Sequence, residues 1–250
     1  MKVVGVILIA VLGFAAGLVA FMPATLVDRE LNAATGGKLR FADATGTLWD
    51  GRGVLMAPGS AWRAPLAFSI APADVVRGMR QVALHPVDGG TTPRGVIDVT
   101  RDGIRLRDVA IDVPAAALLT ALPTRGLAVV GGTLSATSGA FIWSAADKSG
   151  SIEARWRGAR LVVADTVADL GNVDLALSPR DGRLNGRLTN TGGDVRIDGT
   201  IVGADTGAVS VDATVTPSPS APANVARALA AIGSPDASGA VHLAWRGTLR

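Results

Sequence analysis

The 250-residue sequence contains no cysteine, no tyrosine and only two histidines, His85 and His242. The absence of cysteine excludes disulfide frameworks, thiolate zinc sites, iron–sulfur clusters and a cysteine nucleophile. Neither histidine has a second imidazole or a carboxylate at metal-ligand spacing, so we interpret both as structural residues. The sequence therefore predicts no metal site and no cofactor.

Signatures of catalysis are also missing. There is no Gly-x-Ser-x-Gly elbow, no phosphate-binding loop with its lysine, and no Gly-x-Gly-x-x-Gly between a strand and a helix. Four aspartates that are close in sequence could act as acid and base, but they occupy polar strand positions or a turn: Asp98, Asp102, Asp108 and Asp112. We predict that the protein is not an enzyme and has no catalytic residue.

No stretch of the chain combines a run of basic residues with aromatic residues suited to stacking on bases. The 24 Lys and Arg residues are scattered among 21 Asp and Glu residues, and the net charge is only +3. This distribution argues against nucleic-acid binding and favours solvated strand faces. Arg155, Arg157 and Arg160 surround Trp156 and could bind lipid headgroups or an acidic partner, but alternation favours a charged outer face beside a buried Trp156.

The longest apolar run is Val3–Met22, twenty residues without a charge. A helix of this length spans about 30 Å, the thickness of the hydrocarbon core of a bilayer. Lys2 precedes the run, and an acidic excess at residues 28–30 follows it. The positive-inside rule therefore places residues 1–2 in the cytoplasm and the rest of the chain across the membrane. The alternative, a cleaved signal peptide, fits less well because the run is too long and lacks a small-x-small cleavage site.

After Gly37 the apolar residues follow a two-residue period that is broken by turn sequences, as in antiparallel sheets. Hairpins are expected where apolar residues alternate on both sides of such a turn: 173–177 with 184–188, and 195–201 with 209–215. A shift in the phase of alternation predicts a bulge or break near Asp108. Val241–Trp245 is expected to form a last strand.

Helices are expected to be few and short. Residues 23–37 are predicted to hold a connecting helix that begins after Pro23. Further helices are predicted from Pro114 to about Leu122, and from Asn224 as N-cap to Ile232, with Gly233 as the stop. The predicted fold class is therefore mainly β: one N-terminal transmembrane helix followed by antiparallel sheet.

Two similar openings suggest two related β subdomains. Gly46-Thr47-Leu48-Trp49 begins one set of strands, and Gly132-Thr133-Leu134 begins another. We predict subdomains at residues 38–124 and 125–250.

One stretch is more specific than the rest: Ala44-Thr45-Gly46-Thr47-Leu48-Trp49-Asp50-Gly51-Arg52-Gly53. It resembles the Gly-Thr-Leu-Trp-x-Gly signature of protein N of the type II secretion system. Further similar stretches follow in order: Gly150–Ala159 with Trp156, Thr191–Val195 with Gly193, then Gly199, Leu229–Asp236 with Gly233, and Gly239–Gly247. Physically, the glycines of the first stretch allow a tight entry into a strand, with Leu48 or Trp49 expected to insert into the core.

The resemblance implies a single-pass accessory subunit of the bacterial inner membrane with a periplasmic domain. Its partners would be other type II secretion subunits, and its role would be to support export of folded proteins through protein contacts. The residues of the motif would be structural or interfacial. An alternative is a periplasmic lipid-binding or lipid-transfer protein, because strands that are apolar on one side can line a groove for acyl chains.

Overall fold

A computed structural model describes residues 21–37, 39–59, 61–76, 80–87, 90–116, 127–163 and 166–248. They form two compact units, which meet in sequence between Thr100 and Arg101. The predicted membrane helix, Val3–Met22, lies outside the described residues except for its last two positions. Within the described ranges, no helix has both the length and the apolar character needed to cross a membrane. The predicted subdomain boundary after Thr124 also lies outside these ranges and stays a prediction.

The first unit is an antiparallel sheet in which each strand pairs with the next along the chain. Its strands are β1 (Arg40–Gly46), β2 (Asp50–Met56), β3 (Arg63–Ile70), β4 (Arg80–Pro86) and β5 (Arg94–Val99). The short helix expected after Pro23 is observed as α2 (Thr25–Ala34), and a second helix, α3 (Pro72–Val76), follows β3.

The core of the first unit lies between α2 and the sheet. Its aromatic centre is the pair Phe41 and Phe68, whose rings meet edge to face at a centroid distance of 5.6 Å. Val27 and Leu31 pack against the buried cluster that contains this pair, because residues four apart share one face of a helix.

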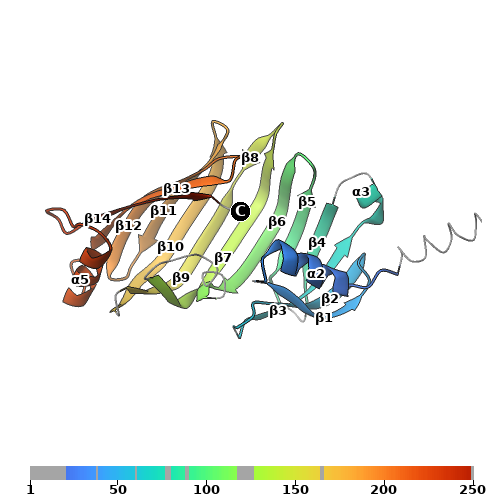
Figure 1. Cartoon of the computed structure of the whole chain (residues 1–250), viewed down its shortest axis with the longest axis horizontal. Coiled ribbons are helices and arrows are strands. Elements are labelled where there is room, and N and C mark those ends of the chain that lie inside the picture. The colour runs from blue at the N-terminus through green and yellow to red at the C-terminus, as the bar shows by residue number, and fades with distance from the viewer. Residues whose placement is uncertain are drawn as a thin grey trace, which may run out of the picture. The chain divides into compact units, whose positions relative to one another are not determined.

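The second unit is a longer antiparallel meander (Figure 1). Its strands are β6 (Gly103–Pro114), β7 (Leu127–Ser144), β8 (Lys148–Gly150), β9 (Ile152–Val163), β10 (Thr166–Arg180), β11 (Arg183–Thr191), β12 (Val195–Gly203), β13 (Ala208–Pro217) and β14 (Val241–Thr248). The short strand β8 pairs with β7, and β9 pairs with both β7 and β10. The helix α5 (Ala223–Ile232) connects β13 to β14.

The expected mainly β, antiparallel character is confirmed, and so are the two hairpins and the last strand. The β10–β11 hairpin closes through only two residues, Asp181 and Gly182, with φ values of 51° and 73°. Positive φ at both central residues is the geometry that the twist of antiparallel strands favours.

The bulge or break expected near Asp108 is not seen in the pairing with β7: β6 runs through this residue, and the irregularity is limited to its backbone conformation. Asp108 has a φ of 49°, and the pairs on both sides of it, Arg107 with Ala140 and Val109 with Ser138, keep the same register with β7. Both Arg107 and Asp108 are exposed, so the alternation of exposed and buried residues along β6 shifts by one residue there. The pairing with β7 does not change.

The helix α5 packs on part of one face of the second sheet, and the core of the second unit lies between the helix and that face. Val225 and Leu229 are buried against Val195, Val215 and Val241. Two predicted helix boundaries are wrong. The N-cap of α5 is Pro222 and not Asn224, which is exposed in the first turn. Pro114 ends β6, and the helix predicted from Pro114 begins one residue later, with Ala115 and Ala116 helical and its remainder outside the described residues.

Candidate functional site

The Gly-Thr-Leu-Trp stretch forms the tight turn between β1 and β2. The Thr47 hydroxyl accepts the backbone N–H groups of Trp49 and Asp50 at 3.3 and 3.2 Å. The Thr47 N–H in turn donates to the Asp50 carbonyl at 2.8 Å. A threonine at this position therefore satisfies backbone groups that a turn leaves without partners.

This turn also binds the chain that enters the first unit. The Leu48 N–H donates to the Met22 carbonyl at 2.7 Å, and the Ala24 N–H donates to the Gly46 carbonyl at 3.3 Å. Pro23 and Thr47 lie opposite each other in an isolated antiparallel bridge. We call residues 22–24 and 46–48 the junction clamp, because together they attach the entering chain to the sheet.

The glycines of the stretch permit close approach. Gly46 has a φ of +90°, and a Cβ there would lie 2.6 Å from the Asp50 carbonyl oxygen. Gly51 is buried, and a Cβ there would lie 2.7 Å from the Phe68 ring and 3.0 Å from the Cβ of Ala24. Gly51 therefore leaves the space in which the entering chain contacts the core.

The expected insertion of Leu48 or Trp49 into the core is not observed. Both side chains are half-buried, and neither belongs to the buried cluster of the unit or to the residues packed against it. Ala24 and Phe68 fill that place instead. The Trp49 carbonyl accepts the Ile70 N–H at 2.7 Å, which ties the turn to the end of β3.

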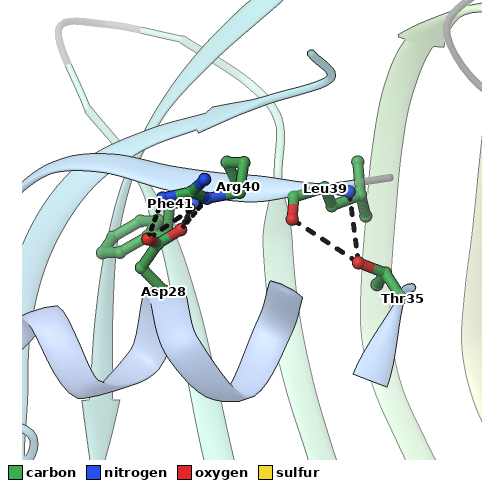
Figure 2. Close-up of polar contacts among 5 residues, drawn as sticks. All are labelled: Asp28, Thr35, Leu39, Arg40 and Phe41. Atoms are coloured by element: carbon green, nitrogen blue, oxygen red, sulfur yellow. Dashed lines mark hydrogen bonds and ion pairs between the residues drawn. The ribbon is translucent and has the colours of Figure 1, made fainter. Parts of the chain in front are cut away.

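A polar lock fixes α2 on β1 (Figure 2). The Arg40 guanidinium donates to both carboxylate oxygens of Asp28, with shortest distances of 2.9 Å to Oδ1 and 2.6 Å to Oδ2, and the Phe41 N–H donates to Oδ1 at 2.8 Å. At the end of the helix, the Thr35 hydroxyl donates to the Leu31 carbonyl at 2.7 Å and accepts the Leu39 N–H at 3.1 Å. The Arg40 bonds, aided by that of Phe41, hold the pKa of Asp28 below its ordinary value.

The lowered pKa of Asp28 predicts that acid loosens α2. A carboxyl group whose pKa is lower in the folded state stabilises that state above its unfolded pKa, and this contribution is lost as the pH falls through the folded pKa. We expect hydrogen exchange in α2 and β1, corrected for the intrinsic rate, to become several-fold faster between neutral pH and about pH 3. Asp28→Asn should exchange faster at neutral pH and lose this dependence. Asp181→Asn, in an exposed turn, is the control, and an unchanged profile in Asp28→Asn would contradict the role of the lock.

In the second unit, the Thr191–Val195 stretch connects β11 to β12 and passes close to the backbone of β10. We call this close approach, with the Asn190 side chain that bridges it, the Asn190 crossing. The Asn190 side chain donates to the carbonyls of Leu170 at 2.8 Å and Val195 at 2.7 Å, and it accepts the Ile197 N–H at 2.7 Å. One polar side chain thus connects three adjacent strands, β10, β11 and β12, on the buried face of the sheet.

Glycines allow this crossing. Gly171 has a φ of +69°, and a Cβ there would lie 2.2 Å from the Thr191 carbonyl oxygen. Gly193 has a φ of +80°, and a Cβ there would lie 2.5 Å from the nitrogen of Gly171. The Asp194 N–H donates to the Asp169 carbonyl at 2.7 Å across the same approach. The backbone of β10 and the connection between β11 and β12 can therefore come this close only because glycines, which have no side chain, lie at the contact.

The remaining residues of the family-like stretches are also structural in their placement. Trp156 packs against the core of the second unit, and its indole N–H donates to the Gly131 carbonyl at 3.0 Å. The flanking Arg155 and Arg157 are exposed, as alternation predicted, and Arg155 pairs with Asp174. At Gly199 a Cβ would lie 2.7 Å from the Cβ of Ala213, and at Gly233 one would lie 2.3 Å from Cγ1 of Val241.

One face of the second sheet is apolar beyond the area that α5 packs against. Strand register places a row of apolar residues side by side from β9 to β14: Ile152, Leu177, Gly186, Ile201, Val211 and Trp245. None of them belongs to the cluster formed with α5, and Trp245 remains 50% exposed. Tyrosine and basic residues are absent from this row, so its character is that of a hydrocarbon surface. We call it the open apolar row.

The described residues do not bring the catalytic candidates together. His85 and His242 are exposed on different units, and His242 lies 3.3 Å from Asp212 on the polar face of the second sheet. Asp98 accepts a bond from Gln81 at 2.7 Å, and Asp102 is in an exposed turn. No group of three or more potential metal ligands is found in the described ranges.

Comparison with known proteins supports the resemblance found in the sequence. A family model described as type II secretion system, protein N, matches residues 37–244, a range that includes both the β1–β2 turn and the Asn190 crossing. No curated protein and no solved structure matches the chain. Because the match covers most of the sequence, the chain belongs to the type II secretion system protein N family.

Proposed function

We propose that this protein is a single-pass, inner-membrane accessory subunit of the type II secretion system. Its β units lie in the periplasm and support the export of folded proteins by contacting other secretion subunits. The family match supports a place in the secretion system. The uncharged run Val3–Met22 and the charges around it support the membrane anchor and its orientation.

The junction clamp is the observation that carries this proposal. The family signature binds the backbone at Met22 and Ala24, at the end of the uncharged run. The main contacts of the signature attach the entering chain to the first sheet. Such an attachment suits a protein whose sheet must keep a defined position beside an assembly in the membrane.

Photocrosslinking in cells tests the partner. A photoreactive amino acid at Arg187 would probe the exposed polar face of the second sheet, and one at Trp245 would probe its open apolar row. We expect adducts with identified type II secretion subunits from Arg187. A secreting cell that yields no such adduct from either position would contradict the accessory role.

Topology can be tested cleanly because the chain has no native cysteine. Ser220→Cys places one thiol in an exposed loop of the second unit. We expect a membrane-impermeant maleimide to label it in spheroplasts without lysis, and the protein to stay in the membrane fraction after carbonate extraction. Labelling only after lysis would contradict the periplasmic orientation.

The open apolar row favours a second candidate function, the binding or transfer of lipid. Its residues could cover acyl chains, and burial of each 100 Å² of apolar surface would contribute about 2–3 kcal/mol. The crosslinker at Trp245 decides between the two functions. Phospholipid adducts at Trp245 without any secretion subunit at Arg187 would favour the lipid function.

A further inference from the structure

The junction clamp leaves no linker between the uncharged run and the first unit. The run ends at Met22, whose own carbonyl accepts the Leu48 N–H at 2.7 Å. A flexible linker of ten residues would let a domain move roughly 17 Å from its anchor. Here the last residue of the run is itself bonded to the turn, so an anchor formed by the run would keep the β1–β2 turn close to its end.

Large apolar side chains are exposed at this place. Phe21 is 81% exposed and Met22 is 36% exposed, and they are neighbours at the entry to the clamp. Among the residues whose side chains the structure describes, the other exposed large hydrophobics are Val99, Val167 and Trp245, and no two of these are adjacent in the chain. Exposure of two adjacent residues of this kind costs free energy in water, and the cost disappears in the boundary layer of a bilayer.

The turn itself has the composition of an interfacial element. Leu48 and Trp49 are both half-buried in the protein, and tryptophan is enriched where a membrane meets water because its ring is apolar and its N–H is polar. Residues 47–49 carry no charge, and Asp50 follows them on the exposed side. Contact with lipid at this turn would therefore depend on apolar character and not on attraction between charges.

We propose that the junction clamp holds the β1–β2 turn, residues 47–49, in the headgroup layer of the membrane. The Gly-Thr-Leu-Trp signature is then a lipid-contacting element as well as a turn. This inference rests on the anchor of the proposed function and adds to it a defined depth for one end of the first sheet.

A fluorescence measurement of depth tests the inference. Leu48→Cys keeps the backbone N–H that bonds Met22, and the labelled full-length protein can be reconstituted in phosphatidylcholine and phosphatidylethanolamine vesicles. The matched control is Pro58→Cys, an exposed residue beyond the other end of β2. Seven residues of strand separate the two positions, which corresponds to about 20 Å.

With a polarity-sensitive label on each thiol, we expect spin-labelled lipids to quench the Leu48 position at least about threefold more than the Pro58 position. The difference should persist at high salt, since no charge attraction is involved. Equal, weak quenching at both positions in protein that floats with the vesicles would overturn the inference and leave the anchor intact. Failure of the protein to float with the vesicles would instead contradict the anchor, and with it both proposals.

Discussion

Gly171→Ala is expected to destabilise the second unit by about 2–5 kcal/mol. The left-handed conformation at φ +69° costs a residue with a Cβ about 1–2 kcal/mol. The new Cβ would also lie 2.2 Å from the Thr191 carbonyl oxygen, and the backbone shift needed to relieve this overpacking adds about 1–3 kcal/mol. Urea unfolding of the full-length protein, with hydrogen exchange in β10–β12, would measure the loss.

Gly182→Ala is the matched control for this substitution. Gly182 has a φ of +73°, close to that of Gly171, but no atom lies within 4 Å of a Cβ built there. Its expected cost is the conformational strain alone, about 1–2 kcal/mol. Equal losses in the two variants would show that the close approach at Gly171 contributes nothing.

Asn190→Leu is expected to have an effect of similar size, about 3–5 kcal/mol. Leucine is close to asparagine in size, but it would leave the Ile197 N–H and the carbonyls of Leu170 and Val195 without their side-chain partner. Each unsatisfied group on the buried face costs about 1–3 kcal/mol, and water can replace part of what is lost. Unfolding midpoints and hydrogen exchange at Ile197 would report the change.

Asn185→Leu serves as the comparison. The Asn185 side chain also donates to two carbonyls, those of Arg180 and Arg183, but it does so at the exposed β10–β11 turn. Water can take over both bonds there, so we expect a loss of only about 1 kcal/mol. If the two leucine variants unfold at the same urea concentration, Asn190 does not lock the three strands.

The local features of the fold were predictable because they depend on residues close together in the chain. The Asp181-Gly182 turn and the alternation from Val209 to Val215 specify a hairpin and its inward face without reference to the rest of the molecule. The N-cap of α5 was predicted wrongly because Asn224 is a good cap by type, whereas the helix begins one residue earlier after a proline loop.

The candidate site was only partly predictable. The Gly-Thr-Leu-Trp stretch was identified by its pattern, but its partner at residues 22–24 was not, because no sequence signal marks which backbone will pair with a turn. Asn190 was missed altogether. A lone asparagine on an apolar strand face is its only signal, since Leu188, two residues before it, packs against the core on the same face.

The sequence by itself determined the family, the β character, the turn positions and the uncharged run before Pro23, because composition and short-range periodicity carry this information. Only the tertiary structure decided how distant segments meet. Strand register brings Gly171 against Thr191 and leaves a row from Ile152 to Trp245 outside the α5 cluster, and the packing of α2 sets Asp28 against Arg40. Register depends on the pairing of whole strands, and the coverage of a sheet face depends on where a helix packs. Neither can therefore be predicted from any single stretch of residues.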